Sequence, residues 1–260
     1  MQTTTHHRSL VFAVIFNYTI HFTQSYIIMG WAETWHDILS GGNQRWKVDY
    51  VDAKRIALEH ILQHHHHHHD NNEPLHILCP LAGDDPFVHY AWSRGHIVTA
   101  IDIVPDALKA MRNLFGSDAE DDWSMSMEDE VGGRTVVWKH KSERVTIIEG
   151  DILTRRTALH QSFDVVYDKD SFGAMALPDR SKFCERISEY MKDDGTLYVE
   201  VKMKDGGRES GGPPFHVEKE DLIQNFGTCY DYVSSLGEVY SLNIPGMKQT
   251  GHILRRSLRR

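Results

Sequence analysis

Acidic side chains follow three short apolar segments of this chain, at positions where buried strands are expected to end. In LHILCPLAGDDP, Asp84 and Asp85 come directly after Gly83. Asp102 ends the segment HIVTAID, and Asp151 ends VTIIEGD. Each acid alone is weak evidence, because aspartate commonly caps a helix after a strand. Together they indicate a ligand site, because parallel strands in an open sheet bind ligands at their carboxyl ends.

The acidic glycine turn limits what that ligand can be. A dinucleotide site needs a G-x-G-x-x-G turn, so that the backbone can approach a pyrophosphate. Carboxylates here would repel a phosphate by about 1 kcal/mol per close pair even in water. S-adenosylmethionine has no phosphate and carries an ammonium and a sulfonium, so it fits better. Asp102 is placed to accept hydrogen bonds from the ribose hydroxyls, and Asp151 to reach the adenine amino group while Ile152 packs on the ring.

The elements that must position these residues alternate along the chain. We expect strands at 76–81, 96–103, 145–151, 163–168 and 196–203, and helices at 85–94, at 105–115 and between Pro178 and Gly195. This order and the continuous apolar strands predict an α/β fold, with a parallel sheet covered by helices on both faces. The segment TVVW is expected to pair with VTII as a hairpin. The acidic stretch 116–134 is expected to be a loop over the sheet edge.

Composition excludes several classes of function. The 260 residues suffice for one large domain with an extension, and the net charge of −9 argues against a nucleic-acid partner. Cys79, Cys184 and Cys229 are scattered and lack metal-site or disulfide spacing, which favours a reducing, cytoplasmic location.

Two segments stand apart from the predicted domain, which we place at 29–260. Residues 1–28 read as a leader, organellar or secretory, or as an extension before a true start at Met29; their apolar run 9–22 is too short to cross a membrane. The histidines at 64–69 fall in a stretch, 63–73, that we interpret as a low-complexity linker. The alternative is a metal-binding tract, but catalytic metal ligands normally come from separate elements, so no metal is expected.

Several segments together resemble one known family. They are PLAG, GHIVTAIDI, EGDIL, FDVVYDKDSFGAMALPDR and GGPPFHVEKEDLIQNFG, and the likeness runs from about Trp31 to Phe226. The chain is similar to the thiopurine S-methyltransferase family, which includes related thiol and halide methyltransferases. The resemblance implies a Rossmann-like, seven-stranded class I methyltransferase sheet and S-adenosylmethionine as the cofactor. It also implies a final antiparallel pair of strands near the C-terminus.

The resemblance also implies site residues. The cofactor-binding positions that it indicates are Trp31, Trp35, Trp46, Leu81, Gly83, Asp102, Asp151, Ile152 and Asp168. The acceptor side would contain Lys169 and the loop Pro213, Pro214 and Phe215, with Lys169 and Asp168 as catalytic residues. Lys169 stands where the family commonly has an arginine, and it lacks the planar fork of a guanidinium. The tryptophans could instead be ordinary core residues. Nothing in the spacing selects Asp170 or His216 as a proton acceptor.

The expected activity is methyl transfer to a small-molecule thiol or a similar soft nucleophile, by a protein that we expect to be monomeric with no membrane partner. A thiol is partly ionised near neutral pH, so no strong general base is needed, and Lys169 could favour an anion by attraction. Two alternatives stay open: another small acceptor (halide, sulfide, oxygen or nitrogen), or a non-catalytic S-adenosylmethionine-binding protein. A nicotinamide dehydrogenase is disfavoured by the acidic turn.

Overall fold

The chain divides into two units, residues 1–46 and residues 47–260. The computed structural model describes residues 33, 35–38, 40–41, 52–65, 73–116, 121–130, 133–242 and 244–257. In the first unit, residues 35–38 are helical, and Ser40 N–H donates to the His36 carbonyl at 3.1 Å. Trp31 and Trp46 lie outside the described residues, as do residues 1–28.

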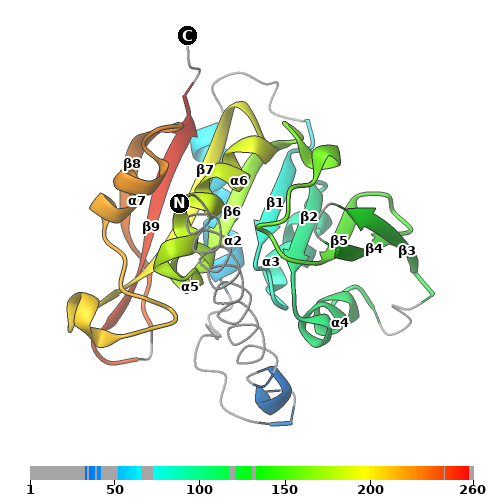
Figure 1. Ribbon diagram of the computed structural model, residues 1–260, viewed down its shortest axis with the longest axis horizontal. Coiled ribbons are helices and arrows are strands. Elements are labelled where there is room, and N and C mark those ends of the chain that lie inside the picture. The colour runs from blue at the N-terminus through cyan, green and yellow to red at the C-terminus, as the bar shows by residue number, and fades with distance from the viewer. Residues whose placement is uncertain are drawn as a thin grey trace, which may run out of the picture. The chain divides into compact units, whose positions relative to one another are not determined.

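The second unit contains a mixed sheet in the order β3-β4-β5-β2-β1-β6-β7-β9-β8 (Figure 1). The strands are β1 (His76–Pro80), β2 (Ile97–Asp102), β3 (Trp123–Glu130), β4 (Gly133–His140), β5 (Val145–Glu149), β6 (Phe163–Lys169), β7 (Met191–Lys204), β8 (Tyr230–Tyr240) and β9 (Met247–Arg256). Strands β5, β2, β1, β6 and β7 run parallel. Strands β8 and β9 form the expected antiparallel pair beside β7.

The expected strand count was wrong, because the described sheet has nine strands rather than seven. The prediction that TVVW pairs with VTII is confirmed, since β4 runs antiparallel to β5. The two strands beyond seven are β3 and β4. The sequence predicted β4, as TVVW, but not β3, which occupies much of the predicted acidic loop 116–134 and pairs along the whole of β4. Glu128 of β3 is exposed, as the open side of an antiparallel edge strand allows. Trp123, at its start, is buried against the rings of Phe115 and His140.

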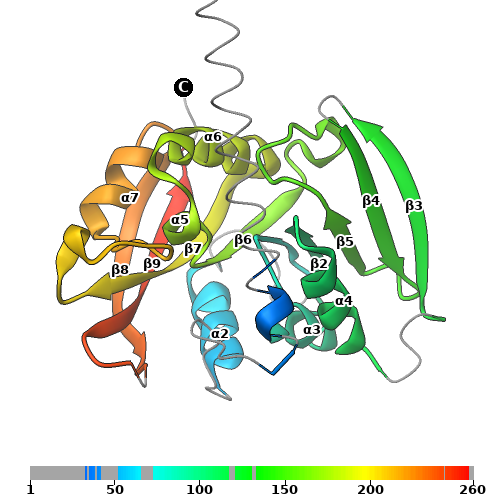
Figure 2. The ribbon, with the colours of Figure 1, turned by 60° about the horizontal axis from the view of Figure 1, so that its bottom comes forward.

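Helices cover both faces of the sheet (Figure 2). On one face lie α2 (Ala53–His65), α3 (Pro86–Ser93) and α4 (Pro105–Asn113); on the other lie α5 (Ser171–Ala174), α6 (Arg180–Tyr190) and α7 (Lys219–Phe226). Three short 3-10 turns, η1 (Thr157–Leu159), η2 (Leu177–Asp179) and η3 (Gly207–Ser210), complete the described elements. The predicted α/β arrangement is therefore confirmed.

Alternation along the strands divides the apolar core in two. Ile77 and Cys79 of β1 pack with the α2, α3 and α4 face, whereas Leu78 between them packs with the α5, α6 and α7 face. Successive side chains of a strand point to opposite faces, so a strand buried on both sides must be apolar at every position. This is why β1 reads as a continuous apolar run.

Two expected boundaries were wrong. Helix α6 ends at Tyr190, well before Gly195, because Met191 already pairs with Phe163 as the first residue of β7. Gly195 lies within β7, where the side chain of Met191 fills the space that a β-carbon would need.

The second boundary is at the histidine run. Residues 63–65 of the predicted linker belong to the last turn of α2. There the ring Nδ1 of His64 lies 2.9 Å from the carbonyl oxygen of His60, one helical turn earlier. Residues 66–72 lie outside the described part of the chain. Within that part, no helix is both long enough and apolar enough to cross a membrane.

Candidate active site

The glycine turn between β1 and α3 is held by the acids around it. Gly83 has a positive φ of 53°, and its N–H donates to Oδ2 of Asp102 at 2.8 Å. Asp85 is the N-cap of α3 and accepts from the N–H of Phe87 at 2.8 Å. Leu81 also has a positive φ, 42°, a conformation that costs a non-glycine residue about 1–3 kcal/mol and clusters at functional sites.

Asp102 lies at the end of β2 and is 9% exposed. Besides Gly83, it accepts from the N–H of Val104 at 2.9 Å. Burial raises the pKa of Asp102 above its usual range, and these backbone hydrogen bonds oppose the rise. Each carboxylate oxygen has two lone pairs, so the residue can hold the turn and still accept further hydrogen bonds.

Asp151 lies beside Asp102 at the same edge of the sheet. The N–H of Gly150 donates to the Asp102 carbonyl at 2.8 Å, which joins the loop after β5 to the end of β2. Asp151 Oδ1 accepts from the N–H of Leu153 at 2.8 Å. Ile152 is 3% exposed and belongs to the core on the α6 face. The edge thus brings together the acids at three strand ends that the sequence predicts as one set: Asp84 and Asp85 after Gly83, Asp102, and Asp151.

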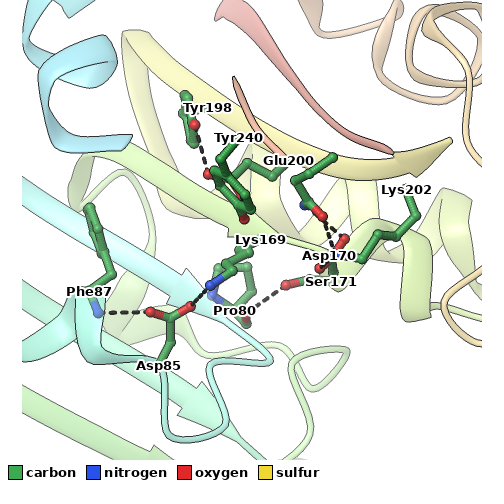
Figure 3. A network of polar contacts seen from close by, with 11 residues as sticks. Pro80, Asp85, Phe87, Lys169, Asp170, Ser171, Tyr198, Glu200, Lys202 and Tyr240 are labelled. Carbon is green, nitrogen blue, oxygen red and sulfur yellow. Dashed lines mark hydrogen bonds and ion pairs between the residues drawn. The ribbon is translucent and has the colours of Figure 1, made fainter. Parts of the chain in front are cut away.

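Lys169, the last residue of β6, forms an ion pair across this edge (Figure 3). Its Nζ lies 3.0 Å from Oδ2 of Asp85, and both side chains are largely buried, at 16% and 15% exposed. In the sheet Lys169 stands directly opposite Glu200 of β7. Burial alone would lower the pKa of Lys169, but Asp85 and Glu200 outweigh it and raise the pKa. Lys169 is therefore a permanent cation and cannot serve as a general base at neutral pH.

Glu200 is a buried carboxylate that receives two tyrosine hydroxyls. Tyr198 donates to Oε1 at 2.8 Å, and Tyr240, from β8, donates to Oε2. Burial raises the pKa of Glu200, while Lys169 and the two hydroxyls lower it. Tyr198 continues a stack of rings across the sheet face, with Tyr167 at 5.8 Å between centroids. The stack fixes the hydroxyl beside Glu200.

A second ion pair adjoins this group. Asp170 follows β6 in the left-handed conformation, φ 64°, and its carboxylate lies 2.8 Å from Nζ of Lys202. Gln249 of β9 donates to Asp170 at 3.1 Å and accepts from Lys202. With Asp85, Lys169 and Glu200, the network holds two cations and three carboxylates, a formal charge of −1 when all are ionised.

Asp168 points to the opposite face of the sheet from Lys169. It is fully buried, and its Oδ1 accepts from the N–H groups of Ser171 and Phe172 at the start of α5, at 2.8 and 3.3 Å. Burial raises the pKa of Asp168 to about 7. These contacts make Asp168 a helix-positioning residue. Its predicted contact with the cofactor and its catalytic role stay predictions.

The predicted acceptor loop packs against α5. Phe215 N–H donates to the Gly173 carbonyl at 2.7 Å, and Pro214 also lies close to Gly173. The guanidinium of Arg180 lies over the rings of Phe172 and Phe215, at 4.5 and 5.8 Å. The acceptor role of this loop stays a prediction, as does the cofactor role of Trp35 in the first unit.

Sequence reasoning missed several members of the network. Glu200 and Lys202 have a visible signal, because TLYVEVKM places two charges inside an otherwise apolar strand. Buried charges need partners, so that pattern could have been noticed. Tyr240 and Gln249 carry no such signal, since they reach the site only through the pairing of β9 with β7 and of β8 with β9.

The comparisons with known proteins agree with this geometry. Residues 33–252 match the family model described as Thiopurine S-methyltransferase (TPMT). Proteins of that name from Rattus norvegicus and Acinetobacter baylyi are 26% and 20% identical to the chain, over 63% and 76% of its length and 68% and 85% of their own.

Two solved structures show the fold. One is the 1,6-didemethyltoxoflavin-N1-methyltransferase of Burkholderia thailandensis, with 1,6-didemethyltoxoflavin and S-adenosylhomocysteine bound. It superposes with a TM-score of 0.61 at 15% identity, over 91% of this chain and 90% of its own. The N-methyltransferase NodS of Bradyrhizobium japonicum, with S-adenosylhomocysteine, gives 0.60 at 13% identity, over 86% and 97%.

Proposed function

Because the chain belongs to the thiopurine S-methyltransferase family, we propose that it transfers a methyl group from S-adenosylmethionine to a small-molecule thiol or a similar soft nucleophile. The family assignment confirms the predicted class, an S-adenosylmethionine-dependent methyltransferase. The thiol acceptor is the part that we add.

The acidic glycine turn supports the cofactor part of the proposal, and the family match and the names of the relatives support the thiol acceptor. Asp102 holds Gly83, and Asp85 caps the helix that follows, so carboxylates surround the turn where a dinucleotide fold would offer bare amides to phosphate. This environment fits a ligand with an ammonium and a sulfonium. Asp102 and Asp151 would hold the adenosine, and the turn at Leu81 and Gly83 would hold the amino-acid end.

The residues on the acceptor side orient the reactants and exclude water. S-adenosylmethionine, when bound, supplies a methyl group already activated by its positive sulfur. The chain needs no covalent nucleophile, and we find no nucleophile–base pair among the described residues that would suggest one. Alignment of the acceptor and exclusion of water are the main tasks left to the protein. The ion pair of Lys169 with Asp85, with the buried tyrosines beside it, would support this side of the edge.

A panel of acceptors with methyl-labelled S-adenosylmethionine tests the proposal. The panel should contain thiols, sulfides, halides, alcohols and amines, with volatile and soluble products analysed together. We expect label in the thiol products. Label only in halide, oxygen or nitrogen products would assign another acceptor and refute the thiol assignment.

Two controls separate the remaining alternatives. A non-catalytic binder would bind S-adenosylhomocysteine in a thermal-shift assay and label nothing in any arm of the panel. A dehydrogenase would be stabilised by NADH and not by S-adenosylhomocysteine. Replacement of the histidines 64–69 by alanine should leave turnover intact; loss of turnover would indicate a role for the histidine run.

A further inference from the structure

The ion-pair network beside Lys169 bears on the charge of the acceptor. A lone lysine at the end of β6 would attract an anion such as a thiolate, a carboxylate or a halide. Lys169 is not alone, because Asp85 lies 3.0 Å from its Nζ and Glu200 lies opposite it in the next strand. Asp85 alone balances the positive charge of Lys169, and with Glu200 the negative charge beside the lysine exceeds it.

The groups that reach solvent strengthen this point. Lys169, Asp85 and Asp170 are each about one-sixth exposed as side chains, at 16%, 15% and 17%, whereas Lys202 is 2% exposed. An incoming molecule therefore meets two carboxylates and one ammonium. The second cation that would balance them is buried behind Asp170 (Figure 3).

From this arrangement we propose that the site selects acceptors without negative charge, and that Asp85 sets this selection by neutralising Lys169. The inference rests on the proposed function and narrows it to a neutral or cationic thiol, sulfide or amine. A thiol is mostly protonated near neutral pH, so the neutral form can bind; as the new sulfur–methyl bond forms and the methyl–sulfonium bond breaks, the thiol proton passes to solvent water and S-adenosylhomocysteine leaves. Halides and carboxylate-bearing thiols are disfavoured.

Asp85 is a suitable residue for the test because asparagine can keep its structural contact. The side-chain oxygen of asparagine still accepts from the N–H of Phe87, and asparagine is among the best N-cap residues. Asp85→Asn therefore removes the charge and keeps the start of α3. Lys169 is then left facing Glu200 alone.

A matched control removes the same charge far away. Asp231 is an exposed carboxylate near the start of β8, and Tyr240 of the network ends that strand. Nine residues of extended chain separate the two, about 30 Å at about 3.3 Å per residue. That distance exceeds the Debye length of about 8 Å at physiological salt. Asp231→Asn changes the net charge equally and should leave the site unaffected.

The experiment measures kcat/KM for mercaptoacetate, 2-mercaptoethanol and cysteamine, small thiols that are anionic, neutral and cationic. Because their intrinsic reactivities differ, the readout is the mercaptoacetate-to-mercaptoethanol ratio in each protein, compared between proteins. We expect Asp85→Asn to raise this ratio about tenfold, the effect of one charge in a partly screened site. Asp231→Asn should leave it unchanged. A helix cap with no electrostatic role would alter all three acceptors alike.

Other outcomes are equally informative. A ratio that Asp85→Asn leaves unchanged overturns the charge selection, as does iodide used as well as 2-mercaptoethanol. If none of the thiols is methylated, the thiol assignment itself fails and the inference falls with it. Should Asp85→Asn fail to fold, added salt in the wild type gives the same information. Screening should raise the ratio, and a constant ratio would refute the proposal.

Discussion

Replacement of Lys169 by methionine tests whether this lysine stabilises the buried carboxylate network. Methionine keeps most of the side-chain volume and removes the cation that faces Asp85 and Glu200. At 3.0 Å and an effective dielectric constant near 20, one ion pair has a gross interaction of about 5–6 kcal/mol. Breaking a buried pair costs about 3–5 kcal/mol net. Because Asp85 keeps some contact with water, we expect a loss of about 3 kcal/mol in the free energy of unfolding.

The pH dependence makes the prediction specific. The pKa of Glu200 in the folded protein is raised above its usual value, 4.5. An acid whose pKa is raised by folding binds more protons in the folded state than in the unfolded state. Its contribution to stability is therefore highest below pH 4.5 and falls as the pH rises to the pKa of the folded protein. Without Lys169 the pKa of Glu200 in the folded protein rises further. The free energy of unfolding of the variant should therefore fall by about 1.4 kcal/mol per pH unit over a wider pH range than in the wild type. The difference in unfolding free energy between the wild type and Lys169→Met should therefore be small near pH 4.5 and largest near pH 8.

Urea unfolding of the wild type and Lys169→Met at several pH values measures this difference. Lys169→Arg, which keeps the charge, is the control and should follow the wild type. The double variant Lys169→Met/Glu200→Gln should recover part of the loss, because it removes the carboxylate left without a cation. Parallel pH curves for the wild type and Lys169→Met would refute the coupling between Lys169 and Glu200.

Three further predictions follow from individual contacts. Asp102→Ala should weaken S-adenosylhomocysteine binding by about 1.5–3 kcal/mol, because it removes a charged hydrogen-bond acceptor and the contact that holds the Gly83 N–H. Calorimetry measures the affinity, and an unchanged affinity would refute this placement of the cofactor. The pKa of Asp168 is raised to about 7, so its ionisation should lower the free energy of unfolding as the pH rises from about 4 to 7. Asp168→Asn should flatten the plot of unfolding free energy against pH in this range, while the asparagine oxygen still accepts from the N–H groups at the start of α5. Arg180→Met should change the free energy of unfolding by less than about 1 kcal/mol, because Nε and Nη2 of Arg180 have no hydrogen-bond partner among the described residues. A loss well above that in urea unfolding would show that the guanidinium's position over the rings of Phe172 and Phe215 stabilises the fold and would refute the prediction.

The parts of the fold that could be predicted are those with a local signal. Strand β1 is predictable because its residues after His76 are apolar and buried, and α4 because proline begins it. The end of α6 was misplaced because Gly195 looks like a helix stop. In the structure it is needed for packing within β7, where Met191 leaves no room for a side chain.

Strand β3 was missed although it has a local signal. In WSMSMEDE, Trp123, Met125 and Met127 alternate with polar residues, as in a strand, but the segment is short and lies in an acidic, turn-rich stretch. In the structure β4 lies beside it and supplies hydrogen-bond partners along its length. Such a strand depends on its neighbour more than on its own residues.

The amino-acid sequence by itself determined the order of the elements, the acids at the ends of β2 and β5, the acidic glycine turn and the family. These depend on patterns within a few residues or on a shared ancestry that the chain still shows. Only the tertiary structure decided what Lys169 does. Its partner Asp85 is 84 positions away in the chain, and its neighbour Glu200 comes from another strand. Which charges meet at a sheet edge depends on strand order and register, and those are set by the packing of the whole sheet rather than by any one segment.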